Sequence, residues 1–139
     1  MRLRHRAWSV LASAVLAGAS LSAEAPEAAA QAAAESWLKT VDAAEYQASW
    51  EQAAKLFKGA VTREQWVQAV KGTRAPLGKL VSRKVKSSHY TEKVPGAPDG
   101  KYVILQFETV FENKASAVET VTPMLDPDGV WRVSGYYIR

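Results

Sequence analysis

The stretch that decides the fold begins with Tyr102-Val103-Ile104-Leu105-Gln106-Phe107-Glu108-Thr109-Val110-Phe111. Two further runs rich in β-branched and aromatic residues follow it, Val118 to Leu125 and Val130 to Ile138. Such residues favour strands, and short polar segments separate the three runs. The segment from Tyr102 to Arg139 is therefore expected to form an antiparallel meander of three strands.

The turns of this meander determine which side chains share a face of the sheet. Asp126-Pro127-Asp128-Gly129 has its proline and glycine where a β-turn needs them, and another turn is expected between Asn113 and Ser116. With Pro127-Asp128 at the centre of the first turn, the predicted apolar face contains Val103, Leu105, Phe107, Thr109, Phe111, Val118, Met124, Trp131, Val133 and Tyr137. The opposite face is predicted to contain Gln106, Glu108, Glu112, Glu119, Arg132 and Tyr136. An antiparallel sheet with helices on one side has this asymmetry.

Helices are expected upstream of the sheet. The first ends near Val41, and its alanine-rich start is expected to fray because it has no large side chains to bury. Asp42 is the expected N-cap of the second, in which Tyr46, Trp50 and Phe57 recur at helical spacing. Thr62 and Gln65 match a capping box for a third helix.

The order of these elements predicts the fold class. Leu80 to Lys93 is expected to be a long first strand, so that three helices precede four strands. Helices followed by strands indicate an α+β fold with segregated layers. We therefore expect three N-terminal helices packed on a curved four-stranded antiparallel sheet, as a single domain over residues 26–139.

The N-terminal residues have the pattern of a secretory signal peptide. Arg2, Arg4 and Arg6 are followed by an uncharged run from Ala7 to Leu21, and then by small residues. The apolar run is shorter than the roughly 20 residues that span a bilayer. We expect residues 1–25 to be a leader cleaved between 19 and 25, and the rest to be periplasmic, without stable membrane insertion.

Composition narrows the possible functions. The chain of 139 residues contains no cysteine, which excludes disulfides, thiolate metal sites and a cysteine nucleophile. Subtracting three arginines and one glutamate of the leader from the formal charge of +4 leaves +2. So small a charge gives little support to nucleic-acid binding. No metal-ligand cluster, phosphate-binding glycine loop or nucleophile motif is present, so neither metal nor cofactor is expected.

Several segments carry a resemblance to a known family. They are Glu35-Ser36-Trp37-Leu38, Arg74-Ala75-Pro76-Leu77-Gly78, Pro95 to Val103, Gln106-Phe107-Glu108-Thr109, Glu119-Thr120-Val121-Thr122 and Asp128 to Ile138. The chain resembles bacterial domain-of-unknown-function family 4019, with the nuclear transport factor 2-like (cystatin-like) cone. This resemblance implies the fold and export. It implies no catalytic residue, because the family has no established activity.

Two functional hypotheses follow. Tyr46, Trp50, Trp66 and Tyr137 could line a pocket for a protein partner or small apolar ligand, although a core would contain the same residue types. This favours a non-enzymatic binding module, and a homodimer through the sheet stays open. The alternative is a small hydrolase or isomerase in which His89, with Glu108 as its partner, is the general base of a cone cavity.

The basic run on the expected first strand also has two interpretations. Lys79, Arg83, Lys84 and Lys86 could contact an anionic partner. Lysines on an edge strand also prevent sheets from pairing edge to edge, and the run has no accompanying aromatic residues for base stacking. The structural interpretation is favoured.

Overall fold

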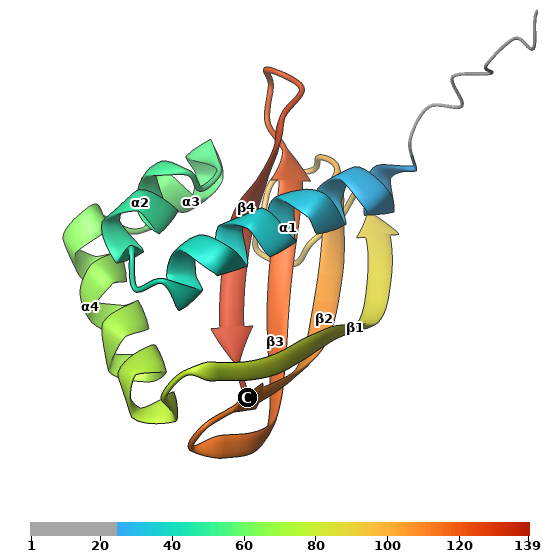
Figure 1. Ribbon diagram of the computed structural model, residues 1–139. Coiled ribbons are helices and arrows are strands. Elements are labelled where there is room, and N and C mark those ends of the chain that lie inside the picture. Colours follow the sequence, from blue (N-terminus) through green and yellow to red (C-terminus); the bar gives the residue numbers. More distant parts are fainter. Residues whose placement is uncertain (1–24) are drawn as a thin grey trace, which may run out of the picture.

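The computed structural model describes residues 25–139, which form helices followed by a four-stranded sheet (Figure 1). The helices are α1 (Pro26–Asp42), α2 (Tyr46–Glu51), α3 (Lys55–Ala60), α4 (Arg63–Arg74) and the 3₁₀-helix η1 (Ala75–Leu77). The strands are β1 (Leu80–Thr91), β2 (Tyr102–Phe111), β3 (Lys114–Leu125) and β4 (Trp131–Ile138). All pairs are antiparallel in the order β1-β2-β3-β4, which confirms the predicted α+β class. Residues 1–24 of the expected leader lie outside the described residues.

The core lies between α1 and the sheet. α1 crosses one face of the curved sheet, and α2, α3 and α4 lie beside the β4 edge (Figure 1). Trp37, Leu38 and Val41 of α1 are buried against the sheet residues Leu105 and Val121. Within the described residues, no helix has the length and apolarity that crossing a membrane requires.

The alanine-rich start of α1 is helical and packs in the core. Ala30 and Ala34 are fully buried, and the helix begins at Pro26, a residue suited to the first helical turn. The expected fraying is therefore wrong. Small side chains have little apolar area of their own, but they let a helix approach a sheet closely, and the neighbouring large residues supply the buried area.

The expected second helix is divided in two. Asp42 is the last residue of α1 and not an N-cap, and α2 ends at Glu51. Ala54 is extended, and its backbone N–H donates to the carbonyl oxygen of Val133 on β4 at 2.8 Å. This tertiary hydrogen bond needs an extended residue between Glu51 and Lys55, so one continuous helix cannot form here.

The predicted register of β3 is wrong by one residue. Phe111 pairs with Lys114, and a bulge before Phe111 then shifts the ladder, so that Phe107 lies opposite Glu119. A one-residue shift moves a side chain to the other face of a sheet. Glu119 is consequently buried on the helix-covered face, whereas Val118 and Met124 belong to the outer face.

The two tyrosines near the end of β4 exchange their predicted faces for a similar reason. Val133 pairs with Pro123 but Gly135 pairs with Thr122, so Ser134 is an extra residue in β4. Proline has no N–H for the ladder, and such positions in strands are associated with bulges. Beyond the bulge Tyr136 packs against the core, and Tyr137 is 56% exposed.

The capping box of α4 is confirmed. Gln65 N–H donates to Thr62 Oγ1 at 3.2 Å, and Thr62 N–H donates to Gln65 Oε1 at 3.0 Å. We predict that Thr62→Ala lowers the free energy of unfolding by about 1 kcal/mol, because one helix-terminal N–H loses its acceptor. Urea denaturation followed by circular dichroism measures the change. Thr62→Ser keeps the hydroxyl and should be close to wild type, and equal losses in both variants would contradict the prediction.

Candidate functional site

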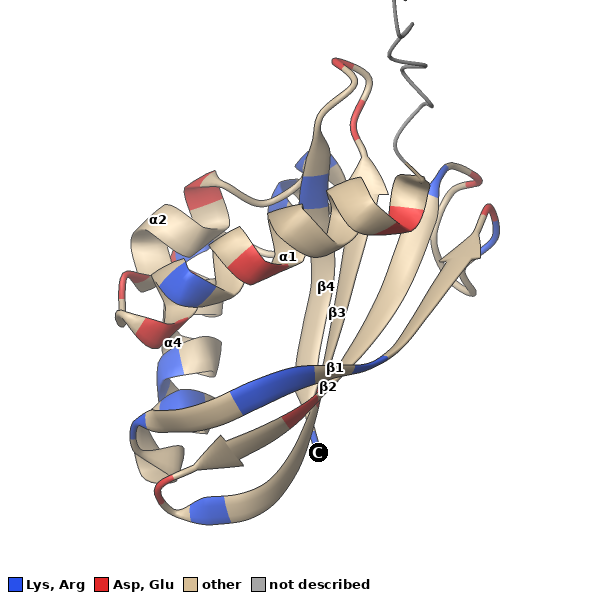
Figure 2. Ribbon diagram, turned by 45° about the vertical axis from the view of Figure 1, so that its right-hand side comes forward, with Lys and Arg blue, Asp and Glu red and all other residues tan. Residues whose placement is uncertain are grey.

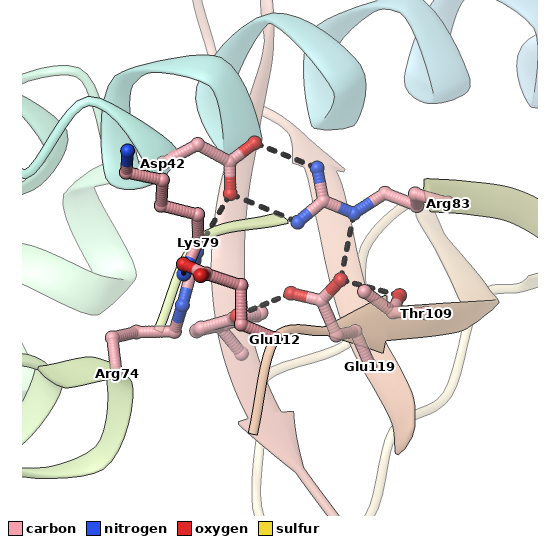
Figure 3. Close-up of polar contacts among 8 residues, drawn as sticks. Asp42, Arg74, Lys79, Arg83, Thr109, Glu112 and Glu119 are labelled. Carbon is pink, nitrogen blue, oxygen red and sulfur yellow. Dashed lines mark hydrogen bonds and ion pairs between the residues drawn. The ribbon is translucent and has the colours of Figure 1, made fainter. Parts of the chain in front are cut away.

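A charged network lies between the helices and the sheet at the end of α1 (Figure 3). It consists of Asp42, Arg74, Arg83, Thr109, Glu119 and Tyr136, which come from α1, α4 and all four strands. We call this set the charged network. It contains most of the buried charge in the described part of the chain, and sequence reasoning placed two of its members, Glu119 and Tyr136, on the outer face.

Arg83 is the centre of the charged network. Its Nη1 and Nη2 atoms donate to both oxygens of Asp42 at 2.8 and 3.0 Å, and its Nε donates to Glu119 Oε1 at 2.6 Å. Burial alone would lower the pKa of Arg83, but hydrogen bonds to Asp42 and Glu119 raise it well above its usual range. The guanidinium is therefore a permanent cation that joins α1 to the sheet.

Glu119 is fully buried in the middle of β3 and accepts hydrogen bonds on both oxygens. Thr109 Oγ1 donates to Oε1 at 2.6 Å beside Arg83, and the Tyr136 hydroxyl donates to Oε2. Burial and the charge of Glu119 raise the pKa of Tyr136 far above that of a free tyrosine. Tyr136 is therefore a hydrogen-bond donor across the neutral pH range, and not a phenolate base.

Arg74 ties α4 to the same cluster. Only 5% of it is exposed; its Nη2 donates to Asp42 Oδ1 at 2.9 Å, and its guanidinium lies 4.7 Å above the Phe111 ring. A carboxylate at the C-terminus of α1 opposes the helix dipole, and two arginines offset this cost. Within residues 25–139, Arg74 Nε and Nη1 have no hydrogen-bond partner, so this arginine is held mainly by Asp42 and by the ring.

The carboxylate oxygens of the charged network are all bound by other members of the network. Each oxygen of Asp42 and of Glu119 accepts at least one hydrogen bond from Arg74, Arg83, Thr109 or Tyr136. A general base needs a free lone pair within reach of a substrate proton. The arrangement thus stabilises the junction of helices and sheet, and a substrate proton taken up by either carboxylate would compete with these contacts.

Three tryptophans are fixed by hydrogen bonds from their indole nitrogens. Trp37 Nε1 donates to the Ser49 carbonyl at 2.8 Å and Trp66 Nε1 donates to Ser49 Oγ at 2.9 Å, so the buried Ser49 joins both rings. Trp50 Nε1 donates to the carbonyl of Val61 at 2.9 Å. These rings fill the space between helices and sheet and have their polar atoms satisfied.

A groove lies beside the charged network, between α4 and the last residues of β4. It has a volume of about 220 Å³ and is lined by Trp66, Ala69, Val70, Thr73, Tyr136, Tyr137 and Ile138. We call it the α4–β4 groove. None of its lining side chains is charged. Ligand pockets are usually lined in this way, with apolar walls and few polar groups.

The structure brings together only two of the four residues expected to form a pocket. Trp66 and Tyr137 both line the α4–β4 groove. Tyr46 lines a different hollow of about 680 Å³ between α2 and α4, together with Val67 and Lys71. Trp50 packs against the core and lines neither hollow. Val70 and Tyr136 of the groove were missed, because only the tertiary structure brings α4 beside β4.

The residues of the alternative enzyme hypothesis are not brought together. His89 is exposed on β1 opposite Ile104, and it lines neither the α4–β4 groove nor the hollow beside Tyr46. Glu108 instead pairs with Lys84 at 3.2 Å. Within residues 25–139, no group of three or more His, Asp or Glu side chains is arranged to hold a metal ion.

The basic run on β1 separates into two kinds of residue. Blue colouring follows the first half of β1 in Figure 2, yet Arg83 points inward to the charged network. Lys84 and Lys86 are exposed, and together with Arg83 they line a hollow of about 480 Å³ formed by β1, β2 and β3. The run is therefore not a continuous cationic surface.

The fold and its buried network define a class of protein: a small α+β domain whose helices cover one face of a curved antiparallel sheet. A family model described as protein of unknown function (DUF4019) matches residues 33–136. The chain belongs to this family. No curated protein and no solved structure was found to match it.

We predict that Arg83→Met destabilises the domain by about 3–5 kcal/mol, because it leaves Asp42 and Glu119 buried with fewer counter-charges. Lys84→Met is a matched control on the adjacent residue, since the Lys84–Glu108 pair is exposed and should contribute less than about 1 kcal/mol. Denaturant titration of both variants measures the difference. Equal effects of the two substitutions would contradict a central role for Arg83.

Tyr136 should make the stability depend on alkaline pH. As pH rises above about 10, the unfolded chain loses the phenolic proton and the folded chain keeps it, so the free energy of unfolding falls. Tyr136→Phe should remove this part of the alkaline decline, in addition to lowering stability at neutral pH. Tyr137→Phe, a change of an exposed neighbour, is the control. A pH profile of Tyr136→Phe parallel to that of wild type would refute the prediction.

Proposed function

We propose that the protein is an exported, non-enzymatic binding module of the cell envelope, which holds a protein partner or small apolar ligand in the α4–β4 groove. The observation that carries this proposal is that the buried charges and the apolar groove are separate parts of the molecule. The buried ionisable side chains of the charged network bind one another, whereas the neighbouring groove is open and uncharged.

The rigidity of the groove walls also supports binding. Trp66 is held by Ser49 and packs edge-on against Phe57, with ring centroids 4.9 Å apart. Tyr136 is held by Glu119, and its ring lies 6.4 Å from that of Trp66. A preformed wall loses little conformational entropy on binding, which favours affinity.

Export is supported by the sequence of the first 25 residues, with its basic start and the uncharged run from Ala7 to Leu21. We also propose that the domain is a nuclear transport factor 2-like (cystatin-like) cone. The strong curvature of the sheet around α1, visible in Figure 1, supports this assignment.

The test is native mass spectrometry of the protein purified from the periplasm of its own source. We expect a mass that lacks the leader and a second species with a retained ligand or partner. Ala69→Phe fills the groove from an exposed position and should abolish the second species, whereas Gln68→Phe on the same helix does not line the groove and should retain it. A wild-type protein that carries nothing, or a bound species indifferent to Ala69→Phe, would contradict the proposal.

A further inference from the structure

The free edge of β4 passes along the α4–β4 groove. β4 is the last strand of the sheet, so one side of it has no neighbouring strand among residues 25–139. Its upper part is covered, because the Val133 carbonyl accepts the N–H of Ala54. After the Ser134 bulge, the β4 residues Tyr136 to Ile138 line the groove. The backbone of another chain could pair with β4 at these residues.

The hydrogen-bond pattern identifies the unpaired groups. Arg139 N–H donates to Val118 O at 3.0 Å and Val118 N–H donates to Arg139 O at 2.9 Å, so these two residues form a close antiparallel pair. Such pairs alternate along a ladder, so Tyr137 turns its backbone toward β3, and Tyr136 and Ile138 turn theirs outward. Outside the sheet, no described hydrogen bond reaches the backbone of Tyr136 or Ile138.

The side chains of the groove have few polar atoms to offer a ligand. The indole of Trp66 is bonded to Ser49, the hydroxyl of Thr73 donates to the Ala69 carbonyl at 3.0 Å, and the hydroxyl of Tyr136 is bonded to Glu119. Apart from the hydroxyl of the exposed Tyr137, the free donors and acceptors beside the groove are the backbone groups of β4. An extended peptide backbone presents donors and acceptors at a spacing that matches these groups.

We propose that the α4–β4 groove binds a short extended peptide segment of a partner protein, which adds as a fifth strand to β4 and places an apolar side chain against Trp66 and Val70. This inference rests on the proposed binding function and names its partner class. Strand addition uses main-chain hydrogen bonds for affinity and side-chain pockets for specificity. The uncharged lining selects a neutral inserted side chain, because burying a charge there would leave it unpaired.

The positive charge of Arg139 at the end of β4 favours an acidic residue at one end of the bound peptide. Arg139 directly follows Ile138, is exposed, and forms no salt bridge with a described carboxylate. A carboxylate on the peptide beside the apolar residue complements this cation. The segment is thus extended, apolar at its centre and acidic at the end that lies near Arg139.

The shape of the edge favours a single strand over a second copy of this domain. In both Figure 1 and Figure 2, α4 lies beyond the β4 edge, so a whole sheet would meet α4 before its strand reached β4. The other edge of the sheet is protected instead. β1 has bulges after Leu80 and Val85, and carries Lys84 and Lys86, all of which oppose edge pairing.

The test uses the leader-free protein and synthetic five-residue peptides with leucine, alanine or lysine at the centre. Each is made with glutamate at the amino end and with glutamate at the carboxyl end, so that an acidic end reaches Arg139 whether the strand adds antiparallel or parallel to β4. Calorimetry should show the leucine peptide binding at least about tenfold more tightly than the lysine peptide. Backbone N-methylation in one alternating register should abolish binding, and in the other register should have little effect. Hydrogen exchange should show the amides of Tyr136 and Ile138 protected by the peptide.

Two variants connect the binding to the groove. Ala69→Phe should weaken the leucine peptide by at least about tenfold, and Gln68→Phe should leave it unchanged, with circular dichroism confirming that both fold. No binding by the leucine peptide, equal tolerance of both methylated registers, or self-association that protects the same amides would each overturn the peptide inference. If native mass spectrometry still shows an Ala69-dependent ligand that is not a peptide, the binding function stands and only the peptide inference fails.

Discussion

The rest of the structure depends on one cation, the guanidinium of Arg83, held between Asp42 and Glu119. It links the end of α1 to β3, and Arg74 adds α4 through the same carboxylate of Asp42. Buried ion pairs often contribute little net stability, because desolvating the charges is expensive. They are nevertheless demanding in geometry, since each member is costly to leave unpaired. We infer that the charged network specifies how the helices sit on the sheet more than it adds to the total free energy of folding.

This constraint also shapes the surface available for binding. Tyr136 belongs to both parts of the site: its hydroxyl binds Glu119 and its ring forms part of the α4–β4 groove. Trp66 is in a similar position, since Ser49 holds its indole while its ring lines the groove. The groove is therefore rigid on both sides. The β4 wall also presents the outward-facing backbone groups of Tyr136 and Ile138, and a strand-like occupant can pair with them.

Much of the architecture could be predicted from the sequence, and the exceptions have identifiable causes. The period-two pattern of Val103, Leu105 and Phe107 predicts the buried face of β2, and the Thr62–Gln65 pair predicts the start of α4, because both signals are local. The face of Glu119 was wrong because a bulge near Phe111 adds one residue to the ladder. A residue count from the turn cannot detect such a bulge. Pro123 was an available warning only for the other bulge, between β3 and β4, which exchanges the faces of Tyr136 and Tyr137, since proline cannot complete a regular ladder.

The sequence by itself determined the α+β class and the succession of helices followed by strands, because these depend on periodicity, caps and turn residues within short windows. It determined the family through the resemblance of several segments to that family. Only the tertiary structure decided that Asp42, Arg83 and Glu119 meet, and that Trp66 and Tyr137 share a groove while Tyr46 and Trp50 do not. The hydrogen bonds between Arg83 and Asp42 alone join residues 41 positions apart. They depend on the bulges of β3 and β4, which invert faces, and on the placement of α4 beyond the sheet edge. Physical contact between distant segments is set by this packing, and no local pattern encodes it.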